Sequence, residues 1–213
     1  MKGEINPQYS KSEEKLNVLT HAFGLLLSII GLPFLVVKSF HYDGFLKPMS
    51  IVIYGVSLIV LYAASTFYHA SKDLKLRRKL NIFDHTAIYV LIAGTYTPYT
   101  LIVLEGTLGW FIFVFTWVFA LIGIVLKLFY TGRFDKLSTM MYVLMGWQIV
   151  LVIKPLMNNL SSEGLQLLFA GGISYTLGAI IYSTKKIHYN HAIFHVFVLF
   201  GSLCHFFSIY YFI

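Results

Sequence analysis

Two short motifs in the sequence combine residues that can bind metal ions or move protons. Ser65 and His69 are four residues apart in STFYH, and His191 and His195 are four apart in HAIFH. Residues at this spacing share one face of a helix, and two histidines so placed can bind the same metal ion. Three histidines, His69, His191 and His195, with water at an open fourth position, would form the ligand set of a catalytic zinc site.

Asp84 lies at the start of another apolar segment, in NIFDH, and could complete such a site. A carboxylate there could hydrogen-bond the water or accept its proton, and Ser65 could orient a ligand or stabilise charge on a substrate oxygen. Structural explanations are also open. The two histidines of HAIFH could form interhelical hydrogen bonds, Asp84 could pair with Arg78 or Lys79, and Ser65 could be a small packing residue.

The segments around these motifs are too apolar for a soluble domain. Of the 213 residues, 58% are hydrophobic and 12% are charged, whereas a soluble domain is closer to half apolar and a quarter charged. Apolar stretches of about 20 residues can cross a bilayer as helices, and none alternates as in a membrane barrel. We therefore expect an all-α, seven-helix membrane bundle, with helices over Leu16–Val37, Met49–Tyr68, Ile82–Leu104, Leu108–Leu126, Leu137–Ile153, Leu165–Tyr182 and His191–Ile213.

The basic residues predict how this bundle lies in the cell membrane. If the N-terminus is cytoplasmic and the segments alternate, only Lys38, Lys47 and Lys154 of the 16 lysines and arginines fall on the outer side. Such an excess on the inner side follows the positive-inside rule, so we expect a cytoplasmic N-terminus and an external C-terminus. The basic residues would then contact anionic lipid headgroups, and nucleic acid is not an expected partner.

This topology brings polar residues from three helices to one depth. The second segment ends with STFYH, the third begins near Asp84, and the seventh begins with HAIFH, all at the inner face. The basic stretch between Lys72 and Lys79 is expected to be the loop that holds the second and third segments there. Ionisable residues inside membranes are costly and usually functional, so their convergence favours a metal site.

Other polar residues have more than one interpretation. Glu14, Asn17 and His21 form one stripe at the inner entrance of the first segment. They could surround the metal ligands or form a lid, but we favour a role in anchoring the helix. His205 follows His195 by ten residues, which is about 15 Å along a helix. It is too far away to bind the same metal, and it could line a cavity or bond to a neighbouring helix.

The chain is expected to form a single membrane domain over residues 1–213. Residues 1–15 are polar and lack the apolar core of a signal peptide, so they are interpreted as a cytoplasmic tail. Cys204 is the only cysteine, which excludes an intramolecular disulfide. Membrane lipids are the expected partners, and no motif indicates a protein partner.

Four stretches together resemble the hemolysin III branch of the progestin and adipoQ receptor family, in its Bacillus-type form. They are EEKLNVLTHAFG near the start, STFYH, FDHTAIYVLIAGTYTPY and HAIFHVFVLFGSLCHF. The resemblance covers nearly the whole chain, with seven segments in the same order. It implies a seven-helix bundle with its N-terminus inside and a zinc ion near the cytoplasmic face.

The resemblance also implies roles for individual residues. The zinc ligands of the family correspond to His69, His191 and His195, the aspartate that holds the zinc-bound water corresponds to Asp84, and the serine of the first motif to Ser65. Among eukaryotic relatives, the adiponectin receptors are linked to ceramide hydrolysis, and alkaline ceramidases belong to the same broader superfamily. Bacterial members were named for haemolytic activity, and some are tied to membrane-lipid homeostasis. The long cytoplasmic region of the adiponectin receptors has no counterpart here, so receptor-type signalling is not expected.

Three functions remain open at this point. The first is a zinc-dependent, ceramidase-like hydrolase of a lipid amide or ester. The second is a cytolysin, which is physically difficult because a hydrophobic seven-helix chain does not readily leave its cell as a soluble toxin. The third is a non-catalytic sensor of lipids or of the membrane, with a structural zinc that joins three helices.

Overall fold

The protein is a bundle of membrane-spanning helices, as the sequence predicts. The computed structural model describes residues 9–131, 134–184 and 186–213. Within these ranges every regular element is helical, and seven stretches are long and apolar enough to cross a membrane. The elements are α1 (Lys11–Ser39), α2 (Leu46–Ala70), α3 (Leu74–Pro98) with its π-helical extension η1 (Tyr99–Leu104), α4 (Gly106–Tyr130), α5 (Asp135–Trp147), the 3-10 turn η2 (Gln148–Val152), α6 (Ile153–Asn159), α7 (Ser162–Ser183) and α8 (Asn190–Phe212).

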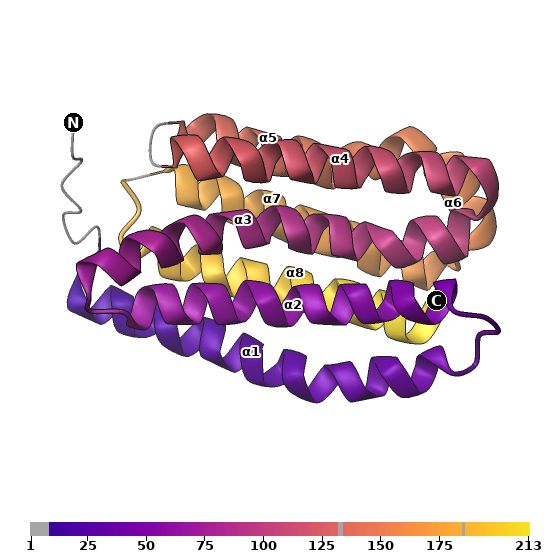
Figure 1. Cartoon of the computed structure of the whole chain (residues 1–213), viewed down its shortest axis with the longest axis horizontal. Helices are drawn as coiled ribbons and strands as arrows, with labels where there is room; N and C mark the ends of the chain where they lie inside the picture. Colours follow the sequence, from indigo (N-terminus) through magenta and orange to yellow (C-terminus); the bar gives the residue numbers. More distant parts are fainter. Residues whose placement is uncertain (1–8, 132–133, 185) are drawn as a thin grey trace.

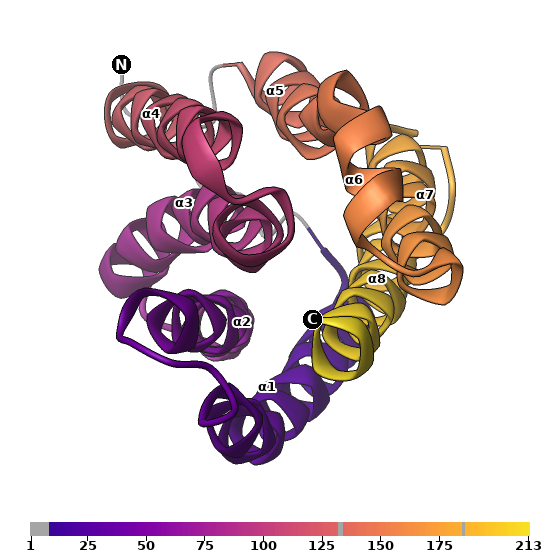
Figure 2. The same ribbon diagram turned by 90° about the vertical axis from the view of Figure 1, so that its right-hand side faces the viewer.

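The helices run side by side along the long axis of the molecule (Figure 1). Seen from one end, they form a ring in the order α4, α3, α2, α1, α8 and α7, and α5 lies between α7 and α4 (Figure 2). The ring places α1 directly against α8, although these helices come from opposite ends of the chain. The start of α1, the end of α2 and the start of α8 therefore meet, which matters for the site described below.

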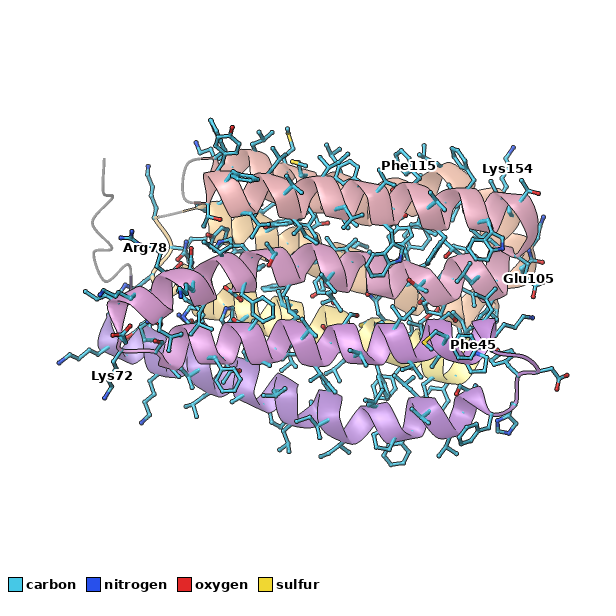
Figure 3. All side chains as sticks on the ribbon, in the orientation of Figure 1. Phe45, Lys72, Arg78, Glu105, Phe115 and Lys154 are labelled. Carbon is cyan, nitrogen blue, oxygen red and sulfur yellow. The ribbon has the colours of Figure 1, made fainter. Side chains whose placement is uncertain are left out.

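The outer surface of the bundle is apolar and its two ends are charged. Large side chains such as Phe115 are exposed along the helices. Lys72 and Arg78 mark one end of the bundle, and Glu105 and Lys154 mark the other (Figure 3). Lipid tails accept apolar side chains but cannot solvate charges, so this distribution matches a helical bundle that spans a bilayer.

Small residues allow the helices to approach closely. A Cβ atom added at Gly24 of α1 would lie 2.4 Å from a ring atom of Tyr62 on α2, so a larger residue at this position would displace the ring. The Tyr62 hydroxyl in turn donates a hydrogen bond of 2.8 Å to Ser202 on α8. Close packing and interhelical hydrogen bonds of this kind hold membrane helices together, and here they join α1, α2 and α8.

The third helix begins earlier than the sequence suggests. We expected Lys72–Lys79 to be a loop, but α3 starts at Leu74 and the connection from α2 is Ser71–Asp73. The Asp73 side chain caps the new helix by accepting a hydrogen bond of 2.7 Å from the Leu76 amide. Arg77 reaches back to the Tyr68 and His69 carbonyls at the end of α2, each at 3.4 Å, and to the Ser71 carbonyl in the connection at 3.2 Å. The basic residues are therefore the first turns of α3, and they tie it to the end of α2.

The fifth predicted segment is helical but interrupted. It changes from α5 to η2 after Trp147 and resumes as α6 at Ile153. The Tyr96 hydroxyl on α3 bridges the break, because it donates to the Gly146 carbonyl at 2.8 Å and accepts from the Ile149 amide at 2.7 Å. Backbone groups that lose their helical hydrogen bonds inside a membrane need such replacement partners. Tyr96 therefore explains how the segment can be interrupted at this point.

The charge asymmetry predicts which end of the bundle faces the cytoplasm. The α2–α3 and α7–α8 connections lie at the end where α1 begins, and the C-terminus lies at the other end (Figure 1). Reporter fusions after Arg78 and after Lys186 should therefore report a cytoplasmic location, and a fusion at Ile213 an external one. A cytoplasmic Ile213 fusion would contradict this orientation.

Candidate metal centre

Three histidines from two helices meet at the end of the bundle where α1 begins. His69 comes from the last turn of α2, and His191 and His195 come from the first turns of α8. All three are buried. Each contributes one ring nitrogen to a group of three nitrogens that all lie within 4.8 Å of one another. The Nε2 atoms of His69 and His191 are 3.1 Å apart. Two of these residues are adjacent because of their i, i+4 spacing, and the third because α2 packs beside them.

This cluster fits a metal ion. Nitrogen ligands lie about 2.0–2.1 Å from a tetrahedral zinc, so two of them are separated by about 3.3 Å. The separation between the Nε2 atoms of His69 and His191, 3.1 Å, is close to that value. Imidazole nitrogens suit zinc and several other transition metals. The three histidines could therefore bind one metal ion.

A carboxylate orients the imidazole of His69. The Nδ1 atom of His69 is 2.7 Å from Oε2 of Glu14. Because an ionised carboxylate only accepts hydrogen bonds, Nδ1 carries the hydrogen and Nε2 keeps its lone pair for a ligand. Arg77 donates a hydrogen bond to Oε1 of the same carboxylate. Glu14 thus bridges α1, α2 and α3, in the arrangement that commonly fixes metal-binding histidines.

The other two imidazoles are oriented in the same manner. The Nδ1 atom of His191 is 3.1 Å from the Tyr9 hydroxyl, and the Tyr9 ring stacks on the imidazole with 4.6 Å between ring centres. Burial raises the pKa of Tyr9, so its hydroxyl keeps its hydrogen. The Nδ1 atom of His195 donates to the Asn17 carbonyl at 3.3 Å and also lies 3.3 Å from the Thr20 hydroxyl.

One short segment therefore supplies partners to all three histidines. Residues 9–20 contact each Nδ1 atom. At His69 and His195 the partner is a carboxylate or a carbonyl, which can only accept, so Nε2 of these two residues keeps its lone pair for a ligand. The same segment also holds the start of α8, because Glu13 accepts a hydrogen bond of 3.3 Å from the His191 amide. Sequence reasoning did not identify Tyr9, Glu13, Thr20 or Arg77, since these contacts depend on the packing of α1 against α8 and carry no local motif.

Asp84 and Ser65 lie beside the histidines. Both are buried, and they line one internal cavity together with His191 and His195. They come from α3 and α2 respectively, and the Ser65 hydroxyl lies close enough to Asp84 to favour its ionised form. The four residues of the two motifs and Asp84 thus all lie at one end of the bundle. The chemical roles of Asp84 and Ser65 remain predictions.

The stripe of Glu14, Asn17 and His21 on α1 lies beside the histidine cluster. A role in anchoring the helix alone, which we favoured from the sequence, would not require this proximity. Glu14 bonds to His69, and the Asn17 amide nitrogen is 3.4 Å from His69 Nδ1. His21 stacks on His195, with 3.4 Å between ring centres, but it does not belong to the group whose nitrogen atoms converge. His205 lies farther along α8, where its Nε2 atom is 3.1 Å from the Leu168 carbonyl.

Comparison with known proteins gives consistent relatives along almost the whole chain. A family model described as "Haemolysin-III related" matches residues 9–206. The chain is 47% identical over 201 residues to the "Hemolysin-3 homolog" of Bacillus subtilis, covering 94% of each chain. It is 44% identical over 201 residues to "Hemolysin-3" of Bacillus cereus, covering 94% of this chain and 92% of the relative. The human "Monocyte to macrophage differentiation factor" is 31% identical over 203 residues, covering 92% and 83% respectively. No solved structure matches the chain.

The first prediction from this geometry concerns the histidines. Purified protein should contain about one transition-metal ion per chain by elemental analysis. His191→Ala and His195→Ala should each lose most of it, because the remaining nitrogens cannot complete a tetrahedral set. The exposed His188 offers a control, and His188→Ala should keep its metal. Full metal content in both ligand variants would disprove the assignment.

The second concerns Glu14. Glu14→Gln keeps the shape of the side chain but removes the charge that orients His69 and pairs with Arg77. We expect metal affinity, measured by competition with a chromogenic chelator, to fall roughly 10- to 100-fold. Glu163 is exposed at the start of α7, at the far end of the bundle, and Glu163→Gln should leave the affinity unchanged. Equal affinities in the two variants would show that Glu14 does not position His69.

Proposed function

The chain belongs to the haemolysin-III related family of multi-pass cell-membrane proteins, and we propose that it is a zinc-dependent hydrolase of a lipid amide or ester. Its role would be in membrane-lipid homeostasis. One observation carries the proposal, namely that two of the three clustered imidazoles, those of His191 and His195, line one internal cavity together with the buried carboxylate of Asp84. A metal that only joined helices would not require a carboxylate and a cavity at the same place.

Three imidazoles with one position left open are the ligand set of many catalytic zinc sites. A zinc ion held by His69, His191 and His195 would polarise a substrate carbonyl and make a water molecule easier to deprotonate. The residues of the chain then have three tasks. They must hold the carbonyl at the histidines, accept a proton from the attacking water, and return a proton to the departing amine or alcohol.

Asp84 is the residue best placed to move the proton. Its carboxylate lies at the cavity end that contains the histidines, so it could take a proton from water and pass it to the leaving group. The Ser65 hydroxyl lies near Asp84, and a hydroxyl has only one hydrogen to donate. Ser65 would therefore either orient the Asp84 carboxylate or stabilise a substrate oxygen, but not both at once.

The cavity suits the apolar part of a lipid. Much of its wall is aliphatic or aromatic. Leu91, Ile92, Phe194 and Val198 are among the residues between the metal centre and the middle of the bundle. A lipid chain could lie along this wall while its amide or ester carbonyl reaches the histidines, which is why we assign a lipid substrate.

Two alternatives use the same features differently. A structural metal could act as a clamp between α2 and α8 in a non-catalytic membrane sensor, with the same three ligands. A cytolytic role is suggested by the names of the Bacillus relatives, although a chain with seven apolar spans is poorly suited to secretion as a soluble toxin. The following experiment separates hydrolysis from both.

The Asp84→Asn variant distinguishes catalysis from a structural role. Because the histidines remain and the amide has nearly the same shape, the variant should keep zinc. Hydrolysis of a panel of lipid amides and esters should fall roughly 100-fold or more, the scale expected for loss of a general base. His69→Ala should lose zinc, and the exposed Asp43 supplies the control Asp43→Asn, which should be fully active.

The outcomes are distinct. Chelator-sensitive hydrolysis by the wild type, lost in Asp84→Asn with zinc retained, supports the mechanism. Retention of both zinc and full hydrolysis in Asp84→Asn would show that Asp84 is not the base. No hydrolysis by the wild type, together with a lower thermal stability of His69→Ala, would favour the structural clamp.

A further inference from the structure

The cavity extends well beyond the metal centre. His191 and His195 line it at one end, and Leu168 and His205 line it farther along the bundle. His195 and His205 are ten residues apart on α8, or about 15 Å along the helix axis. A molecule whose polar head lies at the histidine cluster could therefore extend as far as His205 in the middle of the bundle.

His205 has an unused hydrogen-bond acceptor at this depth. Its Nε2 atom is 3.1 Å from the Leu168 carbonyl, and a carbonyl only accepts, so Nε2 carries the hydrogen. In an uncharged imidazole the other nitrogen, Nδ1, then has a free lone pair. That atom is buried and has no hydrogen-bond partner among the described residues. A buried acceptor without a donor is unfavourable, which suggests that a ligand supplies the donor.

The hydroxyl groups around His205 are already engaged. Tyr175 packs edge-on against the imidazole with 5.3 Å between ring centres, but its hydroxyl bonds to Ser202 at 2.9 Å. Tyr99 also lines the cavity, and its hydroxyl donates to Ser208 at 2.8 Å. The tyrosines thus form a fixed wall, and no hydrogen bond from them to Nδ1 is present.

The packing of α7 is adapted to the imidazole. A Cβ atom added at Gly171 would lie 2.4 Å from Nε2 of His205 and 3.1 Å from the Gly201 carbonyl. Glycine at this position therefore makes room for the ring between α7 and α8. The bundle holds His205 in one orientation, with one nitrogen bonded to α7 and the other unsatisfied.

We propose that His205 forms a second recognition site, where Nδ1 accepts a hydrogen bond from a hydroxyl group on an otherwise apolar lipid chain. The donor must be uncharged, because an anion cannot donate and a cation would be costly at this depth. A separation of about 15 Å corresponds to roughly twelve bonds of an extended chain, at about 1.2 Å per bond. The lipid class is therefore a single acyl chain with a hydroxyl about twelve carbons from its polar head. The proposal rests on the proposed function only in placing that head at the metal centre.

Binding measurements test this site without any need for turnover. The probes are octadecanoic acid and its hydroxylated forms, with the hydroxyl either beside the carboxyl group or about twelve carbons away. Each displaces radiolabelled octadecanoic acid from the full-length protein in detergent. The distant hydroxyl should improve affinity roughly twofold to tenfold, the range of one net hydrogen bond, whereas the adjacent hydroxyl should not.

Variants locate the effect at His205. His205→Phe should reduce the preference for the distant hydroxyl to about one, while plain octadecanoic acid still binds. Val198 lines the cavity without a polar group, so Val198→Ala should change all affinities in parallel and keep the preference. Asp84→Asn should also keep the preference for the distant hydroxyl. Recognition at His205 can therefore be tested independently of the hydrolysis mechanism.

Equal affinity of the wild type for all the acids would overturn the proposal and indicate that only water meets Nδ1. A preference that persists in His205→Phe would overturn it as well, as would the absence of displacement by any of the acids. Because the comparison among acids uses the wild-type protein, a variant that failed to fold would leave the test intact.

Discussion

The site depends on how three imidazoles satisfy both of their ring nitrogens inside an apolar bundle. A neutral histidine has one donor and one acceptor nitrogen, and a wrong choice would turn hydrogens toward the place where a metal must bind. Here Glu14, Tyr9 and the Asn17 carbonyl contact the Nδ1 atoms. The Nε2 atoms are then the ring nitrogens that can face a metal ion, and those of His69 and His191 lie 3.1 Å apart. The orientation of the three candidate ligands is thus set by residues that would not themselves bind a metal.

The fold serves this arrangement by bringing the two ends of the chain together. Residues 9–20 can reach α8 because α1 closes the ring of helices against it (Figure 2). Gly24 admits Tyr62, and Tyr62 bonds to Ser202, so α1, α2 and α8 are joined near the middle of the bundle as well as at the site. Arg77 ties the start of α3 to both Glu14 and the end of α2. The same contacts therefore stabilise the bundle and orient the imidazoles.

The sequence predicts the parts of this structure that rest on local patterns. Apolar length gives the seven spans, and the i, i+4 pairs together with the charge asymmetry place His69, His191 and His195 at one depth. It does not predict the surrounding contacts, because Tyr9 meets His191 only through packing between distant segments. It also misplaces the start of α3, where the Asp73 cap and Arg77 favour helix over loop, and it misses the break after Trp147 that Tyr96 stabilises.

X-ray absorption at the zinc edge of the purified, zinc-loaded protein tests the central claim most directly. The account predicts three imidazole nitrogens at about 2.0–2.1 Å and one further oxygen ligand, which is the signature of an open site. A fourth imidazole would contradict it, since His21 would then have joined the site and closed it. Absence of tightly bound zinc would contradict the metal centre itself.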